Sequence, residues 1–225
     1  MIKTPPYLRK GDTIGLVCPA GYMQGDKIET CVHTLHDWGY KTKIGATIGS
    51  NSPNYFSGTP EERLKDFQAM LDDDEVKAIL CARGGYGATH LVDRIDFKKF
   101  RRSPKWIIGF SDITVLHCHL YTNYYISSMH APMAAAFNDE GYLNPYVQSL
   151  AKALEGKKLK YQCPSSDYNK RGEAIGELVE LLRGEAVDRR RSTDAARVEP
   201  DHVVAVLEGV RHGGVERGGD GVVPR

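Results

Sequence analysis

The chain has 225 residues, 41% hydrophobic and 26% charged, and its 30 Lys and Arg balance 29 Asp and Glu to a formal net charge of +1. This composition is typical of a folded protein with one or two domains. A balanced charge offers no basic field to nucleic acid or an anionic membrane, and no apolar run reaches the roughly 18 residues that a membrane span needs. We therefore expect neither nucleic acid nor a membrane as a partner.

The cysteines and the amino terminus favour a cytosolic protein. The five cysteines are scattered, and none forms a C-x-x-C pair, which argues against a disulfide framework and against a structural zinc site. Residues 1–12 are polar, are interrupted by proline and lack the apolar centre of a secretory signal. We expect a cytoplasmic location, no bound metal and no other cofactor.

Hydrophobic patterning predicts strands that alternate with helices along the first 155 residues. Short apolar or alternating runs predict strands at 13–18, 40–44, 76–82, 105–109 and 125–129. Helical spacing predicts helices at 28–38, 59–71, 88–95, 111–121 and 145–155. The second of these helices opens with a capping box, in which Thr59 precedes Pro60 and Glu62 stands three residues after the threonine.

Units of about 30 residues that alternate strand and helix predict an α/β fold with a parallel sheet covered on both faces. Such sheets bind ligands at the carboxyl ends of their strands, where the winding direction reverses. The loops that we expect to form a site are therefore 18–25, 82–87, 109–112 and 130–140.

The composition changes sharply towards the carboxyl end. All 15 lysines lie at or before Lys170 and all 20 aromatic residues lie at or before Tyr168, whereas nine of the 15 arginines lie in 171–225. Three explanations remain open: a disordered tail, a change of reading frame near 179–183, and a divergent second domain. We favour the frame change, and we divide the chain into a domain at 1–165 and a carboxy-terminal remnant at 166–225, frameshifted or disordered from about residue 180.

A serine occupies the turn between a predicted strand and a predicted helix, in the run WIIGFSDIT at 106–114. Ser111 could project its hydroxyl above the sheet while the first free amides of the helix, including that of Asp112, face the same space. Such an arrangement suits acyl transfer, in which the serine attacks a carbonyl and the amides bind the oxyanion. The alternative is that Ser111 merely caps the helix.

A glycine loop, RGGYG at 83–87, follows the predicted strand at 76–82. Its backbone could approach a ligand closely and supply a second oxyanion amide from Gly84 or Gly85. The loop matches neither common phosphate-binding fingerprint, so a nucleotide site is a weak interpretation. A tight turn with no ligand is the other interpretation.

Three histidines lie near the predicted serine turn. His117 and His119 are two residues apart in one helix and face different directions, so they cannot hold a metal together. His117 is also poorly placed to act as a base for Ser111. His130 should lie at the carboxyl edge of the sheet, where we interpret it as a structural histidine.

Four motifs follow one another along the chain: KGDTIGLVCPAG at 10–21, RGGYG at 83–87, GFSDIT at 109–114 and MHAPM at 129–133. In order and spacing they resemble the LD-carboxypeptidase family of serine peptidases. The resemblance spans about residues 5–180. It implies a flavodoxin-like amino-terminal domain, a smaller carboxy-terminal domain and a possible homodimer. It also implies cleavage of terminal D-alanine from cytosolic murein tetrapeptide without a metal.

The same resemblance implies a role for individual residues. Ser111 matches the nucleophile, the Asp112 amide matches one oxyanion donor and the Gly84–Gly85 loop matches the other. The family draws its Glu and His partners from the carboxy-terminal domain, whose expected motifs are missing after residue 176. Glu208 and His212 stand at plausible positions, and we assign a role to neither.

We therefore interpret the chain as an LD-carboxypeptidase homologue whose activity is impaired because its Glu and His partners are missing. Two alternatives remain. One is a non-catalytic flavodoxin-like module that binds a small ligand. The other is a hydrolase of microcin C-type acyl-adenylates, as in one branch of the family.

Overall fold

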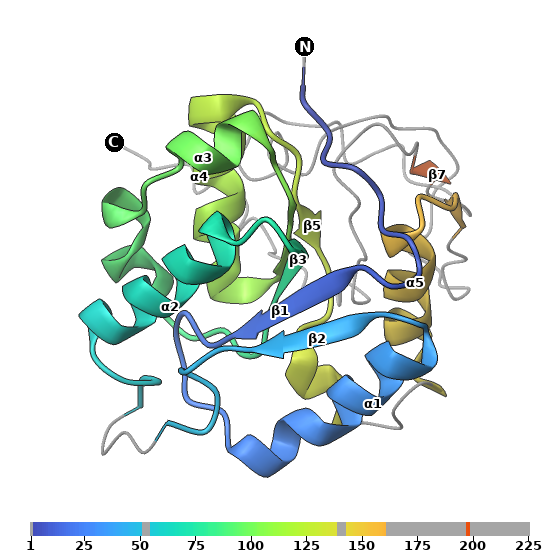
Figure 1. Ribbon diagram of the computed structural model, residues 1–225, viewed down its shortest axis with the longest axis horizontal. Helices are drawn as coiled ribbons and strands as arrows, with labels where there is room; N and C mark the ends of the chain where they lie inside the picture. The colour runs from blue at the N-terminus through green and yellow to red at the C-terminus, as the bar shows by residue number, and fades with distance from the viewer. Residues whose placement is uncertain (1, 51–54, 139–142, 161–196, 199–225) are drawn as a thin grey trace, which may run out of the picture.

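A five-stranded parallel sheet forms the centre of the molecule in the computed structural model, which describes residues 2–50, 55–138, 143–160 and 197–198 (Figure 1). The strands are β1 (Thr13–Val17), β2 (Lys41–Ile44), β3 (Val76–Cys81), β4 (Trp106–Gly109) and β5 (Met129–His130). Their spatial order is β2-β1-β3-β4-β5, and every neighbouring pair is parallel. The predicted α/β class is therefore confirmed.

Helices cover both faces of this sheet. One face carries η1 (Gly25–Ile28), α1 (Glu29–Asp37), η5 (Ala134–Asn138) and α5 (Pro145–Leu154). The other face carries α2 (Pro60–Asp72), α3 (Lys98–Arg102) and α4 (Thr114–Tyr124). In Figure 1, α1 and α5 lie below and to the right of the strands, and α2, α3 and α4 lie to the left.

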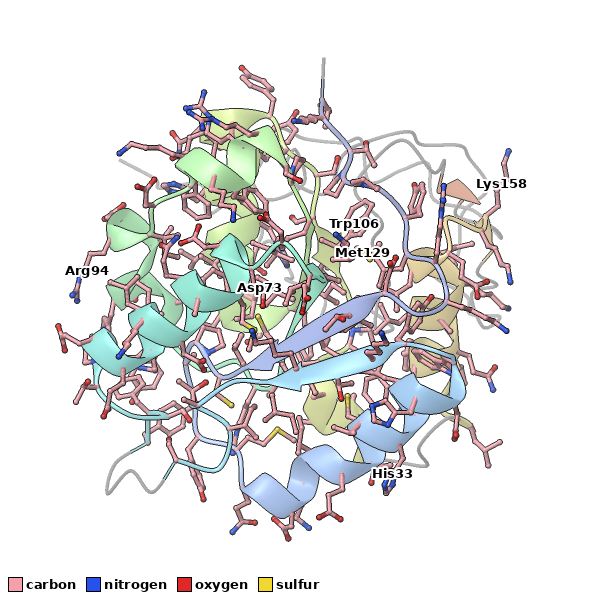
Figure 2. The ribbon with its side chains drawn as sticks, in the orientation of Figure 1. His33, Asp73, Arg94, Trp106, Met129 and Lys158 are labelled. Atoms are coloured by element: carbon pink, nitrogen blue, oxygen red, sulfur yellow. The ribbon has the colours of Figure 1, made fainter. Side chains whose placement is uncertain are left out.

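Alternate residues of the three central strands, β1, β3 and β4, point into two separate hydrophobic cores. On β4, Trp106 and Ile108 pack on the side of α1 and α5, whereas Ile107 packs on the side of α2 and α4. All three side chains are buried, as expected for a strand covered on both faces. Trp106 and Met129 lie inside the molecule in Figure 2, while Arg94 and His33 project outwards.

The strand order places a topological switch point between β1 and β3. The chain moves from β1 to the edge strand β2 and then crosses to β3 on the other side of β1. This order is that of flavodoxin-like sheets, in which the crevice at the carboxyl ends of the two switch-point strands binds ligands. A ligand site is therefore expected at the loops after β1 and β3.

The edge strand β2 carries charge where the other strands carry hydrophobic side chains. Lys41 and Lys43 are both exposed, and Lys43 forms an ion pair with Asp73. Because β2 pairs only with β1, its outer edge has no neighbouring strand in the described sheet.

Helix α2 begins as the capping box predicts. The Thr59 hydroxyl accepts a hydrogen bond from the Glu62 amide at 3.2 Å, and the Glu62 carboxylate accepts one from the Thr59 amide at 2.8 Å. Pro60 occupies the first turn, where an amide hydrogen would have no partner inside the helix.

The predicted strand at 125–129 is wrong in its position. Helix α4 continues to Tyr124, and Tyr125 ends it with a left-handed φ of 53° while its amide donates to the carbonyl of Tyr121. Ile126 then forms an isolated bridge with Lys3, so β5 starts only at Met129. The strand prediction failed here because residues 126 and 127 pair with the amino-terminal segment, a contact between residues far apart in the chain.

The predicted helix at 88–95 is also wrong. Two short 3-10 turns replace it, η2 (Ala88–His90) and η3 (Val92–Arg94). Backbone bonds three residues apart join Leu91 to Ala88 and Arg94 to Leu91, so no α-helical ladder develops. The Gly87 carbonyl and the Ala88 amide, where this segment begins, are bonded to side chains from elsewhere.

The chain continues after α5 into β6 (Leu159–Lys160), which pairs antiparallel with β7 (Arg197–Val198). The predicted boundary at residue 165 and the change expected near residue 180 lie outside the described residues, as does Cys163. No helix in the described part of the chain is both long and apolar enough to cross a bilayer.

The capping box gives a stability prediction. Thr59→Ala removes the hydroxyl that accepts the Glu62 amide, so we expect the free energy of unfolding to fall by about 1 kcal/mol in denaturant titrations. Thr30→Ala is the matched control, since Thr30 is exposed on α1 and the substitution keeps its backbone carbonyl, which accepts the Thr34 hydroxyl. Equal losses in the two variants would contradict a capping role.

Candidate active site

Three loops meet at the carboxyl edge of the sheet. The Gly21 amide, after β1, donates to the Gly84 carbonyl, after β3, at 3.1 Å. The Ala88 amide donates to the Asp112 carboxylate, after β4, at 2.9 Å. These bonds bring the glycine loop between the other two loops, next to the switch point.

Ser111 occupies a constrained turn directly after β4. Its φ of 59° is left-handed, a conformation that costs a non-glycine residue about 1–3 kcal/mol and that recurs at functional sites. The residue is exposed and is the first residue of η4 (Ser111–Ile113). The N-cap position of η4 belongs to Phe110 and that of α4 to Ile113, so Ser111 does not serve as the helix cap.

Gly84 lies against Ser111. A β-carbon built on Gly84 would lie 3.4 Å from Ser111 Cβ and 3.5 Å from Ser111 Oγ, so the two residues are immediate neighbours. Gly85 has a φ of 148°, which L-residues with a side chain rarely adopt, and a β-carbon on it would meet the Tyr55 ring at 2.9 Å. Position 85 therefore requires glycine.

The bond between Gly21 and Gly84 also orients the next amide. The Gly84 carbonyl and the Gly85 N–H belong to one planar trans peptide group, so they point in opposite directions. With the carbonyl held toward Gly21, the Gly85 N–H points away from the loop after β1. The amide direction is thus fixed before any ligand arrives.

A buried arginine ties the surrounding loops together. Arg63 of α2 is only 1% exposed, and its guanidinium donates to the carbonyls of Pro19 at 2.7 Å, Gly87 at 3.0 Å and Gly58 at 3.4 Å. It also stacks over the Phe56 ring at 4.9 Å. Burial lowers the pKa of Arg63, and the nearby Asp112 carboxylate opposes this shift.

We did not single out Arg63 in the sequence, although a signal was present. Arg63, Phe67 and Met70 recur at helical spacing on α2, and all three are buried. An arginine within the apolar stripe of an amphipathic helix indicates a buried cation with specific acceptors.

The histidines occupy structural positions. His117 is buried, and its Nε2 donates to the Gly109 carbonyl, the last of β4, at 2.9 Å. The pKa of His117 is lowered to about 4, chiefly by burial; the Gly109 bond opposes this shift and nearby His130 adds to it. His119 faces elsewhere and packs on Phe97, with ring centroids 5.3 Å apart.

His130 is part of β5 itself, and its ring lies 6.2 Å from the ring of His117. The three histidines therefore do not form a metal site together. Among the described residues there is no group of three or more His, Cys, Asp or Glu side chains that could hold a metal ion.

Cys18 is the other potential nucleophile near the site, because it follows β1 at the switch point. Its side chain is fully buried, and burial raises the pKa of the thiol to about 12. A thiol with that pKa is protonated at neutral pH and is a poor nucleophile. Ser111 is exposed and is the better candidate.

A family model described as the LD-carboxypeptidase N-terminal domain matches residues 14–131, which hold the serine turn and all five strands except the first residue of β1. The chain belongs to the LD-carboxypeptidase family. Membership places Ser111, Asp112 and the Gly84–Gly85 loop inside the matched region, and Glu208 and His212 outside both this region and the described residues.

Two relatives show how much of the family protein this chain covers. A "probable murein peptide carboxypeptidase" from Bacillus subtilis is 35% identical over 182 residues, 81% of this chain and 54% of the relative. A murein tetrapeptide carboxypeptidase from Pseudomonas aeruginosa is 31% identical over 122 residues, 54% of this chain and 39% of the relative. The chain thus spans about half or less of the length of these relatives.

A solved structure of the microcin C7 self-immunity protein MccF, an inactive mutant without ligand, has a similar fold. Its TM-score is 0.64 and its identity 24%, and the match covers 72% of this chain and 50% of that one. At this identity the likeness shows the fold alone.

The buried arginine gives a second prediction. Arg63→Met would leave the buried Pro19 carbonyl without its donor and the Gly87 carbonyl with only the His90 amide, so we expect the free energy of unfolding to fall by about 3 kcal/mol. Arg63→Lys should recover little, because an ammonium cannot reproduce the planar fork of a guanidinium.

Arg94→Met is the matched control for Arg63→Met. Arg94 lies at the surface and pairs with exposed Glu61, so its removal should cost less than about 1 kcal/mol (Figure 2). A similar loss for the Arg63 and Arg94 variants in denaturant titrations would contradict the structural role of Arg63.

The buried histidine His117 gives a prediction of pH dependence. The pKa of His117 is lowered in the folded state, so the unfolded chain binds more protons between pH 6.5 and pH 4. Stability should therefore fall as the pH drops through this range, by on the order of 3 kcal/mol from this residue. Denaturant titrations at several pH values measure the effect.

His117→Gln keeps a donor for the Gly109 carbonyl but does not titrate. We expect this part of the pH dependence to disappear in His117→Gln and to remain in His33→Gln, whose histidine is exposed on α1. Identical pH profiles for wild type and His117→Gln would show that His117 is not held neutral by burial.

Proposed function

We propose that this chain is a serine-type LD-carboxypeptidase homologue, with Ser111 as its nucleophile. One observation supports the proposal most directly: a serine with a left-handed φ stands at the carboxyl end of β4, and its hydroxyl lies next to Gly84 of the glycine loop. Family membership supports the same interpretation.

In the proposed reaction, Ser111 Oγ attacks the carbonyl carbon of the terminal peptide bond while a base takes the hydroxyl proton. The carbonyl oxygen becomes an oxyanion, and the amides of Asp112 and Gly85 are the donors proposed to stabilise it. The bond to nitrogen then breaks as the leaving amine receives the proton, and water hydrolyses the resulting ester.

Two hydrogen bonds among the described residues support these roles for Ser111 and for the amides of Asp112 and Gly85. The Asp112 carboxylate accepts the Ala88 amide, which holds the serine turn against the glycine loop. The Gly21 bond fixes the Gly84–Gly85 peptide, so the Gly85 amide needs no reorganisation when charge develops.

We propose murein tetrapeptide as the substrate, with the bond between the L-centre of diaminopimelate and terminal D-alanine as the one cleaved in the cytoplasm. Both relatives are named for murein peptides. The homodimer and the cytoplasmic location that the family resemblance implies belong to this proposal as well.

We further propose that the chain is impaired. A serine hydroxyl is a poor nucleophile without a base, and His117 is buried and bonded to Gly109, so it cannot serve Ser111. The family takes its Glu and His from a region that this sequence does not reproduce after residue 176. Oxyanion donors alone can leave a rate about a thousandfold above that in water.

The proposal predicts feeble D-alanine release by the 225-residue chain. Replacing the residues after Gly176 with the corresponding carboxy-terminal half of the Bacillus subtilis relative should restore activity by about three orders of magnitude, since the missing base returns. Release of D-alanine from murein tetrapeptide is the measurement.

In the restored protein, Ser111→Ala should abolish activity, whereas Ser103→Ala, at the opposite end of β4, should not.

Robust activity of the unmodified chain that is lost in Glu208→Ala or His212→Ala would contradict the impairment. A restored protein that cleaves an acyl-sulfamoyl adenylate but no murein peptide would favour the microcin branch. Ligand binding without any hydrolysis, also after restoration, would favour the non-catalytic module.

A further inference from the structure

A pocket of about 390 Å³ opens at the carboxyl edge of the sheet, beside the glycine loop. Three loops line it: Tyr22, Gln24 and Lys27 come from the segment after β1, Arg83 from the segment after β3, and Ala135 and Asn138 from η5 after β5. A pocket of this volume is large enough for a small ligand or one end of a peptide.

The pocket carries two cations and no carboxylate among its lining residues. Within the part of the chain that the structure describes, neither Lys27 nor Arg83 forms an ion pair. Arg83 Nη1 donates to the Tyr22 carbonyl at 2.9 Å, which uses one of the five guanidinium N–H groups. The remaining donors and the Lys27 ammonium are available to an anion.

Hydrogen bonds between the three segments hold the pocket walls in place. Asn138 Nδ2 donates to the Lys27 carbonyl at 2.9 Å, which joins η5 to the segment after β1. The Ala135 amide donates to the Ala82 carbonyl at 3.1 Å, which joins η5 to the end of β3. Because the loops are already ordered, little conformational entropy is lost when a ligand binds.

We propose that this pocket binds a carboxylate of the ligand whose bond reacts at Ser111. Arg83 directly precedes Gly84, the residue in contact with Ser111, so the cations and the hydroxyl belong to one continuous edge. Planar carboxylates match the fork of a guanidinium, and Lys27 adds a second charge. The inference rests on the proposed function, whose peptide substrate carries carboxylates at its terminal D-alanine and on diaminopimelate.

Calorimetric titration of the full chain carrying Ser111→Ala tests the inference, since this background binds without turnover. The ligands are murein tetrapeptide, its terminal amide and its diaminopimelate amide, all at one salt concentration. Lys27→Gln and Arg83→Gln should each raise the Kd for tetrapeptide about tenfold or more, the effect of a lost charge-assisted hydrogen bond. Lys65→Gln, an exposed lysine of α2 outside the pocket, is the matched control and should stay within about twofold.

The two amides identify the carboxylate that the pocket holds. The ligand in which this carboxylate is replaced by an amide should bind the Ser111→Ala parent about tenfold more weakly than tetrapeptide does. Its Kd should not rise further when Lys27→Gln is added, because the two changes remove the same interaction. Arg83→Lys should retain more affinity than Arg83→Gln, which separates a lost charge from a disturbed loop. Unaltered affinities in Lys27→Gln and Arg83→Gln would overturn the inference.

A small probe separates this inference from the proposed function. N-acetyl-D-alanine, titrated at millimolar concentration and followed by ligand NMR, should bind the parent more tightly than Lys27→Gln. If the probe binds in this way but tetrapeptide does not, the carboxylate site stands and the proposed substrate is wrong. If neither compound binds the parent, or if Lys65→Gln weakens binding as much as Lys27→Gln does, the inference is wrong.

Discussion

The geometry of the carboxyl edge depends on one buried guanidinium. Arg63 donates to carbonyls of three loops that are separate in sequence, at Pro19, Gly58 and Gly87. A hydrophobic side chain could fill the same space but could not donate to these carbonyls, and burial of an unpaired carbonyl such as that of Pro19 is costly. The glycine loop therefore keeps its position relative to β1 because a helix on one face of the sheet reaches across to hold it.

Two other contacts complete this arrangement. The Asp112 carboxylate bonds the Ala88 amide, and the Gly21 amide bonds the Gly84 carbonyl. Each bond joins the glycine loop to a different neighbour, so the serine turn, the glycine loop and the loop after β1 form one connected unit. A constrained φ at Ser111 can persist only in such a setting, where surrounding contacts outweigh the local cost.

The sequence predicted the parts of the fold that local chemistry determines. Four of the five strands are buried apolar runs or alternations bounded by turns, and the capping box at Thr59 fixed the start of α2. The fifth strand was misplaced because the pairing of Ile126 with Lys3 connects residues far apart in the chain. The serine turn could be recognised from its motif, whereas the pocket with Lys27 and Arg83 could not, since its walls come from three separate loops.

The charged edge of the sheet has a consequence for how copies of this chain can associate. An open edge of backbone donors and acceptors can recruit a strand from another molecule and so extend the sheet from one molecule to the next. Lys41 and Lys43 on β2 would have to lose water and face a second pair of lysines if two such edges met. Continuous sheet growth through the β2 edge is therefore disfavoured.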